Sequence, residues 1–246
     1  MATIPRIPEP KDFSKDLVVT INGPANDKPA ANILILLHGL GDTHSPFAAL
    51  GKNFNFPETA SLAVRAPSKL PFDENGYHWG NDLIFDSSSG GLDMEADFTT
   101  THKLLKTIID DVLVDKCGWN RRAIFFIGMG QGGMVALDLA SRLPAAEGEF
   151  GGVVSLGGPL PNAAPSPHPK AKTPVMAMGA EKNSAITEGA EARLKNVFEF
   201  VEVVKWHGRK EDGMMKNKEE AMPMMQFMAR RLRSNAGIPA GAVELS

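Results

Sequence analysis

Cysteine is almost absent from this chain of 246 residues, which contains Cys117 and no other. A single thiol excludes an internal disulfide framework and any zinc site built from several cysteines. Long apolar runs are absent too, because none approaches the roughly 18 residues that a membrane-spanning helix needs. We therefore expect a protein that folds around its own hydrophobic core, with no transmembrane segment and no disulfide cross-links.

An excess of either charge is also lacking, since 26 basic and 29 acidic side chains leave a net charge of −3. A balance of this kind argues against nucleic acid as the main partner. Residues 1–11 contain no apolar stretch of the secretory-signal type. With 43% hydrophobic and 22% charged residues, the composition is typical of soluble globular proteins, and we expect a cytoplasmic one.

Short apolar runs alternate with longer helical patterns along the chain. The runs that predict strands span residues 17–21, 32–37, 61–65, 123–129, 152–156, 174–178 and 201–206. The patterns that predict helices span 97–116, 131–143, 185–197 and a last stretch reaching Arg233, with Pro223 in its first turn. Continuously apolar strands are expected where both sheet faces are covered. This alternation predicts an α/β fold with a mostly parallel sheet and helices on both faces.

Two irregular stretches, residues 66–92 and 157–173, are rich in proline, glycine and polar residues. Each follows a predicted strand, which is where open α/β sheets place their binding loops. We expect one domain over residues 17–233 with no separate lid. An extended arm over residues 1–16 and a tail over 234–246 flank it.

Two glycine-rich segments stand next to strong strands. Residues 36–43 read Leu-Leu-His-Gly-Leu-Gly-Asp-Thr, and residues 127–134 read Ile-Gly-Met-Gly-Gln-Gly-Gly-Met. Strand, glycine-flanked turn and helix is the context of a nucleophile elbow, in which the middle residue projects above the sheet edge. The His-Gly-Leu-Gly-Asp loop is placed to bring a second backbone N–H to the same spot.

With these two motifs and this strand order, the chain resembles the acyl-protein thioesterase/phospholipase–carboxylesterase family of small α/β-hydrolases from about Asn32 to Leu232. Family members typically read His-Gly-Leu-Gly-Asp in the first segment and Gly-Phe-Ser-Gln-Gly-Gly in the second. The resemblance implies an α/β-hydrolase fold and the hydrolysis of carboxylic esters or thioesters by a Ser-His-Asp triad. It implies no cofactor.

The chain departs from this pattern at all three triad positions. Gly130 stands at the nucleophile position, Lys182 or Asn183 at the acid position, and Lys216 at the histidine position. Glycine has no side chain to attack a carbonyl, and loss of a catalytic serine costs about 10⁶-fold in kcat. We therefore predict a pseudo-hydrolase that binds a small acyl or carboxylate-bearing ligand, or a protein partner, without hydrolysing it.

The resemblance also assigns the parts of the site that remain. It makes the backbone N–H groups of Leu40 and Gln131 the oxyanion donors, and it makes Met129 and Trp79 candidate pocket walls. Two plainer alternatives stand beside these roles: the glycines permit close packing of strand and helix, and Trp79 anchors the core. No histidine and carboxylate cluster has the spacing of a metal site.

Two active alternatives remain open. In the first, an esterase or thioesterase uses a relocated nucleophile, with His207 as base and Glu181 orienting it; the sequence offers Ser155 and Ser184 near strand ends. In the second, a lyase or isomerase uses the oxyanion donors to polarise a carbonyl group. Cys117 is predicted to lie at the opposite edge of the sheet, and oligomeric state is not addressed by these patterns.

Overall fold

The computed structural model describes residues 5–25, 29–71, 75–85 and 91–235, and its centre is a seven-stranded sheet. The strand order is β1-β3-β2-β6-β7-β8-β9, with β1 antiparallel to β3 and every other neighbouring pair parallel. The strands are β1 Val19–Asn22, β2 Asn32–Leu37, β3 Thr59–Val64, β6 Ile124–Met129, β7 Gly152–Leu156, β8 Val175–Ala180 and β9 Val201–Trp206.

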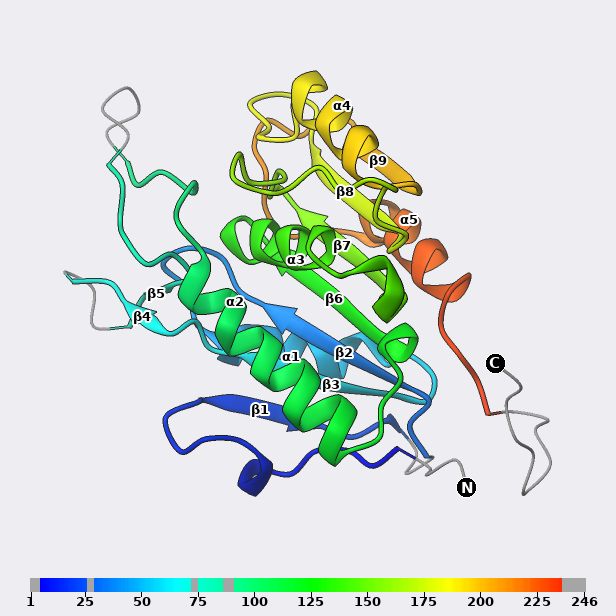
Figure 1. Cartoon of the computed structure of the whole chain (residues 1–246). Helices are drawn as coiled ribbons and strands as arrows, with labels where there is room; N and C mark the ends of the chain where they lie inside the picture. The colour runs from blue at the N-terminus through cyan, green and yellow to red at the C-terminus, as the bar shows by residue number, and fades with distance from the viewer. Residues whose placement is uncertain (1–4, 26–28, 72–74, 86–90, 236–246) are drawn as a thin grey trace.

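Helices cover both faces of this sheet (Figure 1). One face carries α2 Thr99–Lys106 with its π-helical continuation η3 Thr107–Lys116, together with α3 Gln131–Ser141 and α4 Glu188–Val197. The other face carries α1 His44–Phe54 and α5 Lys218–Ala229. The carboxyl ends of the parallel strands point to one edge, from which the longer loops leave.

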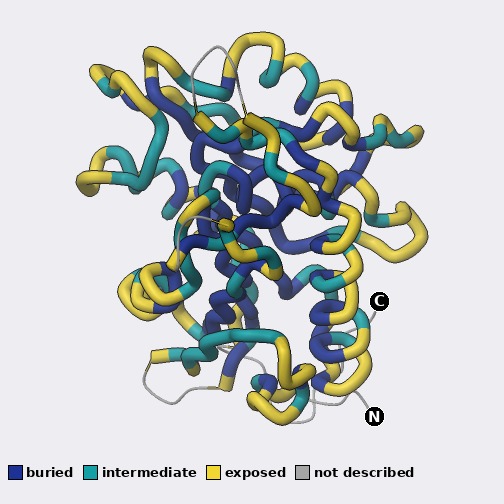
Figure 2. The backbone as a smooth tube through the Cα atoms, turned by 90° about the vertical axis from the view of Figure 1, so that its left-hand side faces the viewer, coloured by how far each residue is buried: buried dark blue, intermediate teal, exposed yellow. Residues whose placement is uncertain are grey.

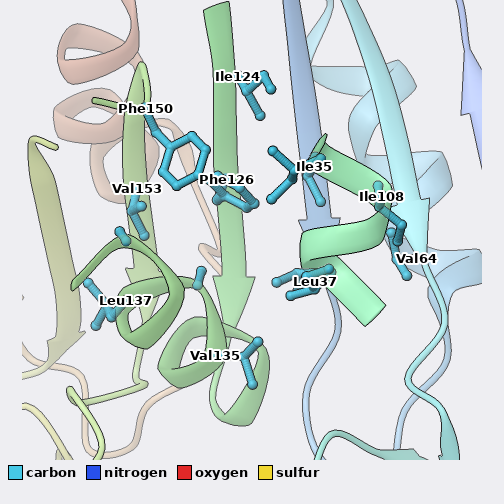
Figure 3. Packing of buried hydrophobic residues seen from close by; sticks show 14 of the residues in the cluster. Ile35, Leu37, Val64, Ile108, Ile124, Phe126, Val135, Leu137, Phe150 and Val153 are labelled. Atoms are coloured by element: carbon cyan, nitrogen blue, oxygen red, sulfur yellow. The ribbon is translucent and has the colours of Figure 1, made fainter. Parts of the chain in front are cut away.

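Successive residues of the central strands contribute to different cores. In β6, Ile124 and Phe126 face the α2, α3 and α4 side, whereas Phe125 and Ile127 face α1 and α5. Figure 3 shows the first of these layers, with strand side chains packed against those of α3 and η3. Because the central strands are buried on both faces, their residues are continuously apolar, as the sequence predicted. Figure 2 shows buried segments of the chain in the interior and exposed segments at the periphery.

The predicted fold class is confirmed, and strands 32–37, 152–156 and 201–206 have the predicted bounds. The placement of Pro223 in a first turn is wrong: α5 begins at Lys218, where the Asn217 side chain caps the N–H of Glu220, so Pro223 lies in the second turn. Helix α1 and the two-residue strands β4 Ser68–Lys69 and β5 Tyr77–His78 were not predicted.

The N-terminal segment packs against the sheet's amino edge through backbone groups. Arg6 N–H donates to the Cys117 carbonyl at 3.0 Å, and the Trp119 indole donates to the Arg6 carbonyl at 2.8 Å. A short 3₁₀ turn, η1, spans Pro10–Asp12. Most of the tail expected after residue 233 lies outside the described residues. Among the described helices, none is long and apolar enough to cross a membrane.

Candidate functional site

The turn between β6 and α3 has the shape of a nucleophile elbow. Gly130 joins strand to helix with φ 48° and ψ −118°, a backbone conformation that L-residues adopt only with strain. Its N–H donates to the Leu156 carbonyl at 2.8 Å, and its carbonyl accepts the Met134 N–H at 3.0 Å. Residue 130 therefore stands at the carboxyl edge of the sheet on a turn fixed by two backbone hydrogen bonds.

Two neighbouring glycines let α3 approach the strands closely. A Cβ built on Gly132 would lie 2.5 Å from the carbonyl oxygens of both Leu37 and His38. One built on Gly128 would lie 2.4 Å from the Gly132 carbonyl oxygen. Both distances are far inside van der Waals contact with backbone atoms, so the close packing requires glycine. The sequence left close packing of strand and helix as an alternative role for these glycines. The structure shows this packing, and it is compatible with a binding role at the same place.

The loop after β2 meets the elbow. A Cβ on Gly39 would lie 3.5 Å from Met129 Cε and 3.7 Å from the Met129 carbonyl oxygen. Leu40 follows directly, and Gln131 is the first residue of α3, where N–H groups have no intrahelical acceptor. Within the described part of the chain, neither of these two N–H groups has a hydrogen-bond acceptor.

A buried polar network ties three loops together around Gln131. The Gln131 side chain accepts the Trp79 backbone N–H at 2.7 Å and donates to the Met94 carbonyl at 3.2 Å. The Trp79 indole donates to the His38 carbonyl at 2.7 Å, and its side chain is fully buried. Trp79 is thus an anchor that aligns the loops, and its ring is not an exposed wall of the site.

His38 is held as a neutral ring within the same network. Its Nε2 accepts the Ala66 N–H at 3.0 Å, which leaves the proton on Nδ1, and Nδ1 donates to the Gly39 carbonyl at 2.8 Å. Burial lowers the pKa of His38, since the charged ring would lose its hydration. The histidine therefore fixes the turn before Leu40.

A methionine borders the space beside Gly130. A Cβ built on Gly130 would lie 3.3 Å from Met94 Sδ, and among the described residues no other heavy atom outside the adjoining ones lies within 4 Å. Met129, which the sequence assigned to the pocket wall, is half-buried at the end of β6. The position where a nucleophile would stand is thus bordered by a soft thioether.

The residues at the other two positions that the resemblance assigns to the triad are exposed. Lys182 and Asn183 lie in the turn after β8, Asn183 with φ 46°. Lys216 lies in the loop before α5, where its N–H donates to Glu220 Oε2 at 2.7 Å. Arg209 pairs with the same glutamate at 2.8 Å. A salt bridge and a helix cap hold this loop.

Sequence reasoning missed Asp212. Its carboxylate comes from the loop before α5 but lies against the turn after β8, where it accepts the N–H groups of Ala180 and Ala185. The order of residues within one loop indicates only local contacts, whereas this carboxylate reaches from the loop before α5 to the turn after β8. The sequence feature next to Asp212 that points to the site is the Gly-Met-Met segment at residues 213–215.

His207 and Glu181 are close together but open to solvent. Nδ1 of His207 lies 3.4 Å from Glu181 Oε2, and the ring is 97% exposed. Ser155 is buried under the elbow and donates to the Gly158 carbonyl, while Ser184 Oγ accepts the Ile186 N–H. Across the described residues, no hydroxyl or thiol is hydrogen-bonded to His207.

Cys117 is buried where η3 ends, before the strand that leads into the elbow begins. It therefore lies at the amino edge of the sheet, away from Gly130. Burial raises the pKa of its thiol, which makes the thiolate scarce. In the ranges that the structure describes, no group of three or more histidine, cysteine, aspartate or glutamate side chains is placed to hold a metal ion.

The parallel sheet, the elbow and the loop after β2 together define the α/β-hydrolase class. A family model described as Phospholipase/Carboxylesterase matches residues 22–233. The chain belongs to this family. A Schizosaccharomyces pombe protein described as an uncharacterized hydrolase is 33% identical over 205 residues, which cover 82% of this chain and 83% of the relative.

Acyl-protein thioesterase 1 of Saccharomyces cerevisiae is 29% identical over 147 residues, 54% of this chain and 60% of that protein. Solved structures agree on the fold. Esterase PE8 superposes with a TM-score of 0.71 at 23% identity, covering 88% of this chain and 99% of its own. Acyl-protein thioesterase 2 of Zea mays gives 0.61 at 18% identity, with the same coverage of 88% and 99%.

Proposed function

We propose that this protein is a non-hydrolytic member of the family that binds a small acyl or carboxylate-bearing ligand at the elbow. The observation that carries the proposal is Gly130 itself, which holds the elbow turn without a side chain. Lys182 or Asn183 and Lys216 at the remaining triad positions supply neither acid nor imidazole base. The backbone of the site is thus kept while its nucleophile and its base are missing.

The two backbone N–H groups of Leu40 and Gln131 support a ligand of this class. They lie on adjoining segments, they have no acceptor among the described residues, and the start of α3 favours negative charge. Without a side chain at residue 130, an acyl oxygen has more room to reach them. YahD, a fold neighbour with a TM-score of 0.61 at 14% identity, has been solved with malic acid, a dicarboxylate.

Hydrolysis is tested first, with p-nitrophenyl acetate and an acyl thioester as substrates. We expect wild-type turnover at the uncatalysed background, and no labelling by a fluorophosphonate probe, because none of the described hydroxyls or thiols is hydrogen-bonded to His207. Turnover well above background that His207→Ala abolishes would overturn the proposal in favour of a relocated triad. Labelling of a serine would do the same and would identify the residue.

Binding is tested by titrating acetate and malate into the labelled protein while backbone N–H resonances are followed by NMR. We expect the largest shifts at Leu40 and Gln131, with weaker shifts at the same residues for methyl acetate, which has an acyl carbonyl but no charge. Gly130→Val should reduce the effect at least about tenfold, because a branched side chain fills the space beside Met94. Gly189→Ala, on the exposed start of α4, serves as the matched control. Shifts spread over other surfaces would contradict the assignment.

A further inference from the structure

Asp212 belongs to the loop before α5, but its carboxylate is hydrogen-bonded to the turn after β8. Oδ1 accepts the Ala180 N–H at 2.7 Å, and Oδ2 accepts the Ala185 N–H at 2.8 Å. These donors bracket the turn after β8, whereas Asp212 follows β9 in the sequence. Both oxygens of one carboxylate thus join the turn after β8 to the loop before α5.

Two glycines form a cradle for this carboxylate. A Cβ built on Gly157 would lie 2.7 Å from Asp212 Cβ and 3.0 Å from its Cγ. One built on Gly179 would lie 3.0 Å from Asp212 Oδ1. A side chain at Gly157 would displace Asp212 and one at Gly179 would crowd its carboxylate, so the ends of β7 and β8 together make room for it.

The cradle adjoins the elbow. Gly158, the residue after Gly157, packs against it so closely that a Cβ there would meet the Gly130 carbonyl oxygen. In a hydrolase triad the acid accepts one ring N–H of the histidine, and the other ring nitrogen faces the nucleophile. The resemblance puts that acid in the turn after β8, and it is the N–H groups of this turn that Asp212 binds.

We propose that Asp212 has taken over the place of the triad acid, so that the site lacks a nucleophile and a base but keeps its carboxylate. This inference depends on the proposed function in one respect, since both take Gly130 as the nucleophile position. Each carboxylate oxygen accepts one backbone N–H and retains a further lone pair. Asp212 is half-buried as a residue, which leaves part of it open to an approaching imidazole.

Lys216 is the position from which an imidazole would come. It lies four residues after Asp212 in the same loop, and Arg209 holds that loop by donating to the Met214 carbonyl at 3.2 Å and to Glu220 at 2.8 Å. The exposed Lys216 side chain is available for replacement. The proposal therefore predicts that the double variant Gly130→Ser/Lys216→His, with Asp212 unchanged, is an esterase.

The variant would hydrolyse p-nitrophenyl acetate in two steps. The introduced hydroxyl oxygen forms a bond to the acetyl carbon, its proton passes to the introduced imidazole, and the bond to p-nitrophenolate breaks. The imidazolium then releases this proton to solvent. In the second step the neutral imidazole takes a proton from water, whose oxygen forms a bond to the acetyl carbon. The bond from that carbon to the hydroxyl oxygen breaks, this oxygen takes the proton back from the imidazolium, and acetic acid leaves and ionises to acetate. Asp212 accepts the other ring N–H and stabilises the imidazolium without itself taking a proton.

We expect the double variant to turn over p-nitrophenyl acetate at least about 100-fold faster than the wild type, with a rate that rises through the titration of an imidazole near pH 6.5. Adding Asp212→Asn should lower kcat by about tenfold or more at nearly constant KM and alter the pH profile. Glu211→Gln, the neighbouring exposed carboxylate, is the matched control and should change neither.

Thermal unfolding of every variant separates a positioning role from a structural one. If Asp212→Asn lowers Tm but leaves the kcat and pH profile of the double variant unchanged, Asp212 is only a structural link and the proposal is wrong. A folded double variant that stays at background would overturn it as well. Carboxylate binding by the wild type is measured separately, so either failure leaves the proposed function standing.

A further variant avoids any change at Asp212. Adding the exposed Lys182→Asp to the double variant introduces a second carboxylate in the turn after β8. If Asp212 already supplies the acid, kcat should rise by less than about threefold. A gain of about tenfold or more would show that the acid place was vacant, which contradicts the proposal.

Discussion

The two halves of the site differ in what holds them together. The elbow and the loop after β2 form the first half, in which buried glycines, Gln131, Trp79 and His38 fix the backbone. The turn after β8 and the loop before α5 form the second half, which carries exposed lysines and the exposed His207. The first half carries the backbone N–H groups and Gly130, and the second half carries the positions that the resemblance assigns to the acid and the histidine.

Under the proposed function, this difference lets the fold persist without hydrolysis. The first half is part of the core packing, so its sequence is constrained even when no substrate is hydrolysed. Exposed side chains of the second half contribute little to stability, so their replacement costs the fold almost nothing. Asp212 is the exception in the second half, because its carboxylate satisfies two backbone N–H groups.

The largest effect is expected at Gly132 in the first half. Gly132→Ala forces a Cβ within 2.5 Å of two carbonyl oxygens that belong to the backbone and cannot move aside. We expect a loss of about 3 kcal/mol, which lowers Tm by roughly 6–12 °C in a chain of this size.

Gly189→Ala in α4 is the control, since its Cβ meets only Thr187 Oγ1 at 3.7 Å. It should stabilise the protein by about 0.5–1 kcal/mol, because alanine has the higher helix propensity. Equal Tm values for the two variants would show that the close packing at the elbow is not a constraint on the fold.

The second effect concerns acid stability. Burial lowers the pKa of His38, His44 and His78 in the folded protein, so the unfolded chain takes up these protons first as the pH falls below about 6.5. Above that pH these rings are neutral in both the folded and the unfolded chain, so they do not change the free energy of unfolding. Stability is therefore lost between about pH 6.5 and the folded pKa values, at about 1.4 kcal/mol per pH unit for each proton.

His38→Gln keeps one donor and one acceptor but cannot titrate, so its free energy of unfolding should depend less steeply on pH between 6.5 and 5 than that of the wild type. Denaturant titrations at several pH values measure this slope. Gly189→Ala, at an exposed position without a titratable group, should leave the slope as it is. An unchanged slope in His38→Gln would show that this histidine is not part of the acid response.

The contrast between buried segments with local patterns and contacts between distant loops decides what could be predicted from the sequence. Strands such as β2 and β7 were predicted with their bounds because burial on both faces makes them continuously apolar. Helix α1 was missed, since Pro46 and Gly51 obscure its short apolar stripe. The position of Gly130 follows from a local motif, whereas the contact of Asp212 with Ala180 joins residues 32 positions apart and has no local signature.

The smallest effect is expected at His207, and it bears most directly on the alternative of a relocated triad. Its ring is 97% exposed and touches Glu181 at 3.4 Å, a surface pair of the kind that contributes little. Glu181 keeps its hydrogen bond from the Gly208 N–H at 2.7 Å when the ring is removed. His207→Ala should therefore change Tm by less than about 2 °C and leave both the hydrolytic background and carboxylate binding unaltered. If it weakened binding of acetate or malate instead, the ligand would extend from the elbow across both halves, and the division between them would have to be abandoned.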